Sequence, residues 1–168
     1  MKSDNKDELF PVMDEVGNVV GSATRGECHG GSRLLHPVVH LHLFDADGRI
    51  YLQKRPEWKD IQPGKWDTAV GGHVDYGESI AEALRREVRE EVGLTQFDEE
   101  FLTRYIFDSG REREYVHTYR ARIHPDAGEP SDELDGGRWW TIAELEASPE
   151  LLTPNLRQEL RQVFGINV

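Results

Sequence analysis

Alternating apolar and polar positions predict a chain built largely from short strands. Gly17 and Asn18 supply turn residues for a first hairpin, and the run 45–48 supplies those of a second, longer hairpin. Gly71 and Gly72 are predicted to close the strand before them. The predicted strands cover residues 9–13, 19–21, 35–44, 49–55, 66–70, 101–108, 114–123 and 137–141.

A helical period in the apolar residues marks three further segments. The strongest covers residues 78–92, and Gly93 follows it at the position that helix ends favour. A closing helix is predicted over 154–164, and a shorter one over 141–147. The glycine-rich stretch 24–32 is predicted as a loop or a short helix. The apolar stripe of the strongest helix consists of Ile80, Ala81, Leu84, Val88 and Val92.

Composition and charge exclude several classes of protein. The 168 residues, 37% of them hydrophobic, fit one compact domain with a core. The 32 acidic residues against 20 basic ones give a net charge of -12, which opposes non-specific binding to nucleic acid. No apolar run approaches the roughly 18 residues that cross a bilayer, and residues 1–9 lack the apolar core of a signal peptide. With a single cysteine, Cys28, these features predict a cytoplasmic protein that binds neither nucleic acid nor membrane.

A glycine-rich turn followed by an acidic helix carries the candidate chemistry. The turn begins at Gly72, and the helix then reads Arg-Glu-Val-Arg-Glu-Glu-Val-Gly-Leu from Arg86 onward. Its carboxylates at Glu87, Glu90 and Glu91 fall within an arc of about 100° around the helix axis. Because three such carboxylates repel one another, the pattern favours a bound divalent cation, and oxygen-only ligands suit Mg²⁺ or Mn²⁺.

The segment 72–94 resembles a complete Nudix box, the signature of hydrolases that cleave a diphosphate linked to another moiety. The resemblance implies an α/β fold, a Nudix-type α/β/α sandwich with a mixed β-sheet. It also implies that Glu87, Glu90 and Glu91 bind Mg²⁺ or Mn²⁺. The metals would bridge diphosphate oxygens and hold a water in line with the attacked phosphorus. One of these glutamates would accept the proton of that water, and the sequence does not decide which.

Four further residues are candidates for supporting roles. Glu78 and Arg86 are predicted to lie on the same solvated side of the helix, and the resemblance implies that Arg86 steers the catalytic carboxylates. Gly72 and Lys65 are the candidates in the loops around the substrate.

Histidines are concentrated around the glycine-rich turn, and three of them resemble part of a second metal site. Together with two nearby glutamates they are similar to the three-His, two-Glu site of type I isopentenyl-diphosphate isomerases. This likeness covers roughly residues 25 to 120. We expect the set to bind a metal, either as a second site or as a retained structural one. Its members are His29, His36, His73, Glu112 and Glu114.

Two departures oppose isomerase activity. The isomerases place an essential cysteine two residues before the histidine of the turn, where this chain has Gly71. They also have an eroded box, whereas all three box glutamates are present here, so hydrolysis is favoured. His40 and His42 are interpreted as structural residues of a half-exposed strand, and Trp139 and Trp140 as core residues.

The sequence therefore predicts a single domain in which residues 1–34 form an N-terminal extension with a short hairpin and residues 35–166 form the hydrolase domain. The predicted reaction is metal-dependent hydrolysis of a small organic diphosphate, such as a nucleoside diphosphate derivative. An isopentenyl-diphosphate isomerase is the first alternative, and a non-catalytic module that senses a nucleotide or phosphate sugar is the second. Loops 108–113 and 124–133 are expected to set specificity. The first two strands could extend a sheet or swap with a second copy, which allows a homodimer.

Overall fold

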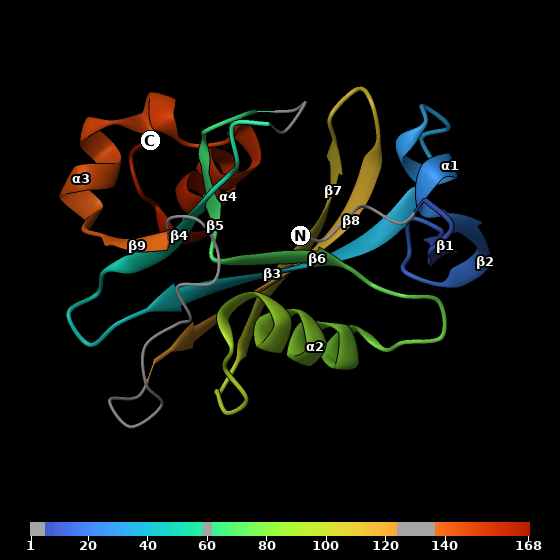
Figure 1. The fold of residues 1–168 in the computed structure, drawn as a ribbon, viewed down its shortest axis with the longest axis horizontal. Coiled ribbons are helices and arrows are strands. Elements are labelled where there is room, and N and C mark those ends of the chain that lie inside the picture. The colour runs from blue at the N-terminus through green and yellow to red at the C-terminus, as the bar shows by residue number, and fades with distance from the viewer. Residues whose placement is uncertain (1–5, 59–61, 124–136) are drawn as a thin grey trace.

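A mixed β-sheet runs through the middle of the molecule, as the computed structural model shows for residues 6–58, 62–123 and 137–168 (Figure 1). Five strands lie in the order β5-β4-β3-β8-β7, while β6 pairs with β3 and β9 pairs with β4. β3 and β8 run parallel, and the other pairings are antiparallel. The strands are β3 (Leu35–Phe44), β4 (Ile50–Lys54), β5 (Trp66–Thr68), β6 (Val70–His73), β7 (Glu100–Asp108), β8 (Arg113–Arg122) and β9 (Gly137–Trp140).

Helices cover both faces of the sheet, which confirms the predicted α/β arrangement with a mixed sheet between helices (Figure 1). One helix, α2, lies along one face, and α3 and α4 are grouped on the other. A separate hairpin of β1 and β2 lies with α1 beside the N-terminal end of β3. No helix of the described residues is long and apolar enough to span a membrane. The bounds are β1 (Leu9–Met13), β2 (Val19–Thr24), α1 (Arg25–His29), α2 (Ile80–Val92), α3 (Ile142–Ala147), the 3-10 helix η2 (Pro149–Leu151) and α4 (Pro154–Phe164).

Two apolar cores hold these layers together. The core between β3 and α2 contains Leu41 and Leu84, neither of which has exposed surface. The core under α3 and α4 surrounds Trp140, which packs edge to face against Trp66. Trp140 is 2% exposed, and Trp139 packs partly buried against the other core. The prediction of core tryptophans is therefore confirmed for Trp140, whereas Trp139 lies at the margin of a core.

The strand predicted over 66–70 is wrong at its end. Two short strands occupy this stretch, because β5 ends at Thr68 and the chain then crosses from β4 to pair with β3 as β6. Gly71 and Gly72 lie inside β6 and do not close a strand. Since side chains alternate along a strand, Gly72 faces α2, whereas Gly71 and His73 face the opposite side.

Helix α2 begins at Ile80, two residues later than the apolar pattern predicts. Ser79 caps it. The Ser79 hydroxyl accepts a hydrogen bond from the Glu82 amide, and the Glu82 carboxylate accepts one from the Ser79 amide. Gly93 ends the helix in the left-handed conformation, as expected. Glu78 therefore lies in the turn and not in the helix.

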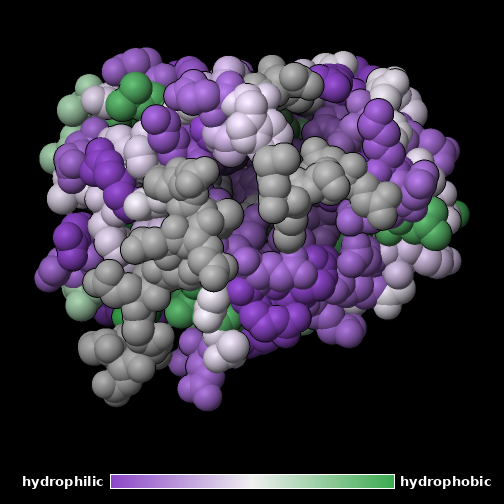
Figure 2. Space-filling view, viewed as in Figure 1, coloured by the Kyte–Doolittle hydropathy of each residue, from purple (hydrophilic) through white to green (hydrophobic). Residues whose placement is uncertain are grey.

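The buried side of α2 differs from the predicted stripe at one position. Ala81 is exposed, and Ala83 lies in the core in its place. The buried side is displaced toward Glu87, which is itself 8% exposed because it packs against β6. Figure 2 shows a broad hydrophilic surface where the outer side of α2 faces the viewer.

Candidate active site

The turn between β6 and α2 brings two carboxylates of α2 against the backbone of β6 and a third close to Arg86. The Gly71 amide donates a hydrogen bond of 3.1 Å to Oε2 of Glu91. The Glu87 carboxylate lies against Gly72, where a Cβ atom would overlap it. Glu90 lies on the same side of α2, with its side chain 35% exposed. The three glutamates predicted as metal ligands therefore gather at one edge of β6.

Arg86 forms hydrogen bonds and ion pairs with both the helix carboxylates and the turn. Its Nε and Nη2 donate to the two carboxylate oxygens of Glu78 at 2.8 and 2.9 Å. Its Nη1 donates to Oε1 of Glu87 at 2.6 Å and lies 3.5 Å from Oε2 of Glu90. Nη2 also donates to the His73 carbonyl at 3.0 Å. A planar guanidinium suits this forked geometry, so Arg86 fixes the orientation of Glu87.

The prediction that Glu78 and Arg86 lie on a solvated helix side is wrong. Glu78 precedes the cap of α2, and its side chain is 16% exposed against 22% for Arg86. The backbone turns at Gly77, whose φ of +88° favours glycine, and this turn brings Glu78 back to the helix. Hydrogen bonding from Arg86 holds the pKa of Glu78 below its ordinary value, so the pair is ionised at neutral pH.

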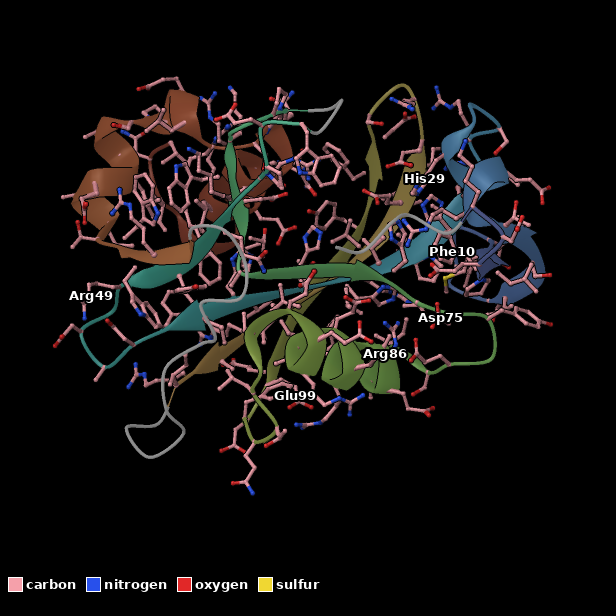
Figure 3. All side chains as sticks on the ribbon, viewed as in Figure 1. Phe10, His29, Arg49, Asp75, Arg86 and Glu99 are labelled. Carbon is pink, nitrogen blue, oxygen red and sulfur yellow. The ribbon has the colours of Figure 1, made fainter. Side chains whose placement is uncertain are left out.

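The box residues fit a hard divalent cation. Carboxylate oxygens are the ligands that Mg²⁺ and Mn²⁺ prefer, and Gly72 leaves the space that the Glu87 carboxylate occupies. Asp75 adds a further carboxylate 3.5 Å from Arg86, and burial raises its pKa. Figure 3 shows Asp75 on the loop that leaves β6, with Arg86 on α2 nearby.

On the opposite side of β6, the second predicted set of ligands also comes together. Nε2 of His29 lies 3.1 Å from Nε2 of His73 and 3.2 Å from Oε2 of Glu112. Nε2 of His73 lies 3.8 Å from Oε2 of Glu114. With His36, these histidines offer ligand atoms that all lie within 4.8 Å of one another. We call these five residues the His/Glu cluster.

Hydrogen bonding orients His36 toward this cluster. Its Nδ1 donates to the Leu34 carbonyl at 2.9 Å, which leaves the lone pair of Nε2 available to a metal. That buried Nε2 has no hydrogen-bond partner within the described residues. Burial lowers the pKa of His36, and lowers that of His73 further, so both imidazoles are neutral at neutral pH. Neutral imidazoles are the form that ligates metals, and the cluster therefore fits a divalent cation.

The two carboxylates of the cluster are unfavourable as anions when no cation is present. Burial raises the pKa of Glu112. Burial, together with the nearby Glu112 carboxylate, raises the pKa of Glu114 to about 7. A divalent cation would offset both effects, because its charge favours the ionised carboxylates.

The N-terminal hairpin covers the cluster. Phe10 of β1 stacks on His73, with the ring centroids 4.6 Å apart and the planes 3° apart. The guanidinium of Arg25 lies 5.1 Å from the centroid of the Phe10 ring. Figure 3 shows Phe10 and His29 together at the end of the molecule that carries β1 and α1. Residues before β3 therefore form one wall of the cluster.

A buried glutamate on α4 binds the two other histidines of β3. The sequence patterns did not single out this glutamate. Glu159 is 1% exposed and accepts hydrogen bonds from His40 Nδ1 at 2.5 Å and His42 Nε2 at 2.9 Å. The hydroxyls of Thr118 and Tyr105 donate to the same carboxylate at 3.0 and 2.5 Å. The predicted half-exposed strand is thus wrong here, because α4 packs over it. No local motif could reveal a partner more than a hundred residues away along the chain.

Other predicted residues lie elsewhere. Lys65 Nζ donates to the Glu150 carbonyl at 2.9 Å, and within the described residues it hydrogen-bonds neither the box nor the His/Glu cluster. The loop 108–113 ends the β7–β8 hairpin and contributes Glu112 to the cluster. The loop 124–133 lies outside the described residues.

Comparisons with known proteins agree with this architecture. The model of the NUDIX domain matches residues 34–163. An uncharacterized Nudix hydrolase of Streptomyces coelicolor is 34% identical over 145 residues, which cover 83% of this chain and 78% of that protein. An isopentenyl-diphosphate delta-isomerase of Mycolicibacterium vanbaalenii is 33% identical over 137 residues, 76% of each chain. The crystal structure of the DR0079 protein from Deinococcus radiodurans superposes with a TM-score of 0.76 at 24% identity, covering 94% of this chain and 99% of that one.

These relatives establish the family but not the reaction. The hydrolase and the isomerase are about equally distant in sequence, so identity does not choose between them. The likeness to the Deinococcus radiodurans structure concerns the fold. The domain model spans most of the chain and includes the whole segment 72–94. The chain therefore belongs to the Nudix family.

Proposed function

We propose that this protein hydrolyses the diphosphate linkage of a small organic diphosphate, such as a nucleoside diphosphate derivative, with Mg²⁺ or Mn²⁺. The observation that carries the proposal is the fixed arrangement of the box carboxylates. Arg86 holds Glu87, the Gly71 amide holds Glu91, and Gly72 lets Glu87 approach β6. Such preorganisation is what a site needs to bind cations and a diphosphate in one geometry.

The chain's own groups have two tasks in this reaction. The cations, when bound, would neutralise the diphosphate and orient the attacking water. One box glutamate accepts a proton from that water on a carboxylate oxygen, while the water oxygen bonds to phosphorus and the bond from phosphorus to the leaving oxygen breaks. Arg86 keeps Glu87 aligned and offsets part of the charge of the carboxylates.

Hydrolysis of a panel of organic diphosphates, with Mg²⁺ and with Mn²⁺, tests the proposal. We expect metal-dependent release of a phosphate-containing product by the unmutated protein. Glu87→Gln and Glu91→Gln should each remove most of the activity while the protein stays folded. Glu146→Gln, the same change at an exposed position of α3, serves as the control. If both box variants keep most of their activity, the assignment of the metal ligands is wrong.

We also propose that the His/Glu cluster binds a second divalent cation, and this cluster is what favours an isomerase as the alternative function. That reaction moves protons on carbon, and Gly71 has no side chain to carry one. Including isopentenyl diphosphate in the panel, with identification of the product, separates the two reactions. Conversion to dimethylallyl diphosphate without hydrolysis would establish the isomerase.

The third candidate is a module that senses a nucleotide or a phosphate sugar without turnover. It predicts thermal stabilisation by such ligands and no product with any member of the panel. The oriented box carboxylates favour catalysis over sensing. We place the reaction in the cytoplasm, because a single buried cysteine, Cys28, is typical of chains that work in a reducing compartment.

A further inference from the structure

His40 lies directly across β6 from the box carboxylates. In the sheet it pairs with Gly71, the residue whose amide donates to Glu91. Cδ2 and Nε2 of His40 lie 3.5 and 3.8 Å from where a Cβ atom of Gly71 would be, and apart from the adjoining residues no other atom of the described residues comes within 4 Å of that point. Because Gly71 is exposed, the missing side chain leaves an opening above the edge of the His40 ring.

The other nitrogen of His40 is fixed by a buried carboxylate. Nδ1 donates to Glu159, whose four hydrogen-bond donors fill the acceptor positions of both its oxygens. The Glu159 carboxylate raises the pKa of His40 to about 9 despite the burial of the ring, so the imidazole is charged at neutral pH. Nε2 of His40 therefore carries a proton, and it lies 3.8 Å from the Cβ position over Gly71.

His42 provides an internal comparison. It donates to the same carboxylate at a similar distance, but its side chain has no exposed surface, whereas that of His40 is 13% exposed. A purely structural pair does not need a partly exposed ring, and replacing a buried ion pair with apolar residues is often neutral for stability. The difference between the two histidines suggests a ligand at the exposed one.

Two further carboxylates influence His40. Asp67 of β5 and Glu114 of β8 both favour its protonated form, in addition to Glu159 of α4. The ring nitrogen that Glu159 does not occupy can donate a charge-assisted hydrogen bond to an anionic oxygen, provided that bound cations offset the negative charge of the surrounding carboxylates. Nε2 of His40 lies within about 10 Å of Oε2 of Glu91, because Gly71 contacts both side chains. A phosphate group bound through a cation on Glu91 can span that distance.

We propose that His40 is a substrate-binding residue, whose Nε2–H donates a charge-assisted hydrogen bond to an oxygen of the diphosphate over Gly71. This inference rests on the proposed function for the nature of the ligand. Glu159 is then a positioning residue, which orients the ring and keeps it protonated. Of the four residues that donate to Glu159, His40 is the one that lies at the opening over Gly71.

Binding of methylenediphosphonate in the presence of Mg²⁺, measured by calorimetry, tests this inference without catalysis. His40→Gln should weaken binding by about tenfold or more, because a charge-assisted hydrogen bond is lost. His42→Gln removes a similar bond to Glu159 and should leave the affinity within about twofold of the unmutated protein. Both variants should lower the melting temperature. A loss of affinity in His40→Gln alone would therefore not be caused by lower stability.

The inference is overturned if the two variants change the affinity equally, or if His40→Gln does not change it. The hydrogen bonds around Glu159 would then have a structural role alone. If His40→Gln fails to fold, imidazole NMR signals of the unmutated protein give the answer. The His40 signal should shift on adding the diphosphonate with Mg²⁺, whereas that of His42 should not, and an unmoved His40 signal overturns the inference. Failure of the unmutated protein to bind the diphosphonate also overturns it.

The outcomes separate this inference from the proposed function. Hydrolysis with an unchanged KM in His40→Gln would overturn the role of His40 alone. Diphosphonate binding that depends on His40, without hydrolysis of any member of the panel, would overturn the proposed reaction alone.

Discussion

A Cβ atom at Gly72 would overlap the carboxylate of Glu87, so packing against a catalytic candidate requires glycine at this position. The requirement does not come from backbone conformation, because Gly72 does not have a positive φ angle. The first residue of the box is thus explained by the approach of α2 to β6. Its neighbour Gly71 contributes an amide, and only ordinary van der Waals contact would oppose a side chain there.

Gly72→Ala should displace Glu87 and weaken Mn²⁺ binding at the box by roughly 10- to 100-fold, because metal ligands depend on the residues that orient them. Hydrolysis should fall at least as far. Calorimetric titration with Mn²⁺ measures the affinity. Gly21→Ala, in β2, is the control, since nothing lies within 4 Å of a Cβ atom there. Normal Mn²⁺ affinity in Gly72→Ala would show that Glu87 is not a ligand.

Arg86→Lys should reduce both stability and activity. A lysine ammonium cannot replace the forked contacts to Glu78 and Glu87, so a partly buried carboxylate loses its partner. We expect a loss of about 1–3 kcal/mol in the free energy of unfolding, measured by urea denaturation. Arg89→Lys, on the exposed side of the same helix, should change stability by less than about 0.5 kcal/mol. Equal losses in the two variants would contradict the role given to Arg86.

Features that depend on neighbours along the chain could be predicted from the sequence. The bounds of β1, β3 and α4 agree with the apolar pattern to the residue. The three box glutamates share one side of α2, because residues three and four apart always do so on a helix. The meeting of His29, His36 and His73 was also expected, but from a resemblance and not from periodicity.

Features that depend on tertiary contacts could not be predicted. The chain crosses from β4 to β3 at Ala69, and an apolar run does not reveal which strand each half will pair with. Arg86 seemed solvated because Glu78, which accepts two of its hydrogen bonds, belongs to a turn that a helical wheel cannot represent. The Glu159 carboxylate shows no local signal, because its donors come from β3, β7 and β8.

Divalent cations should stabilise the His/Glu cluster more at pH 8 than at pH 6. Without a cation, the pKa of Glu114 is raised from 4.5 to about 7. Its contribution to stability is therefore present below pH 4.5 and is lost as the pH rises through 7. A cation requires the ionised carboxylate, so its affinity increases over the same range.

The melting temperature of Glu91→Gln with and without Mn²⁺ isolates this effect, because the box site is weakened in that variant. At 100-fold excess over the dissociation constant, we expect an increase of roughly 5–10 °C at pH 8. Adding His36→Gln should abolish it. The same increase at pH 6 and pH 8 would argue against Glu114 as a ligand.

The network around Glu159 should make the protein less stable in mild alkali. The pKa of His40 is raised from 6.5 to about 9, so its contribution is fully present below pH 6.5 and disappears as the pH rises through 9. Urea denaturation between pH 8 and 9, above the range in which Glu114 titrates, measures the decline. Cys28 does not interfere, because burial raises its pKa to about 11.

Glu159→Gln should lower the free energy of unfolding at pH 6.5 by about 3–5 kcal/mol, because it leaves the His40 ring without a counter-ion. The pH dependence between 8 and 9 should largely vanish with it, since an amide cannot favour the charged imidazole. Glu144→Gln, at an exposed position of α3, should preserve that dependence. A decline of equal slope in Glu159→Gln would mean that another group titrates in this range, and that the His40–Glu159 pair does not carry the charge on which the diphosphate contact depends.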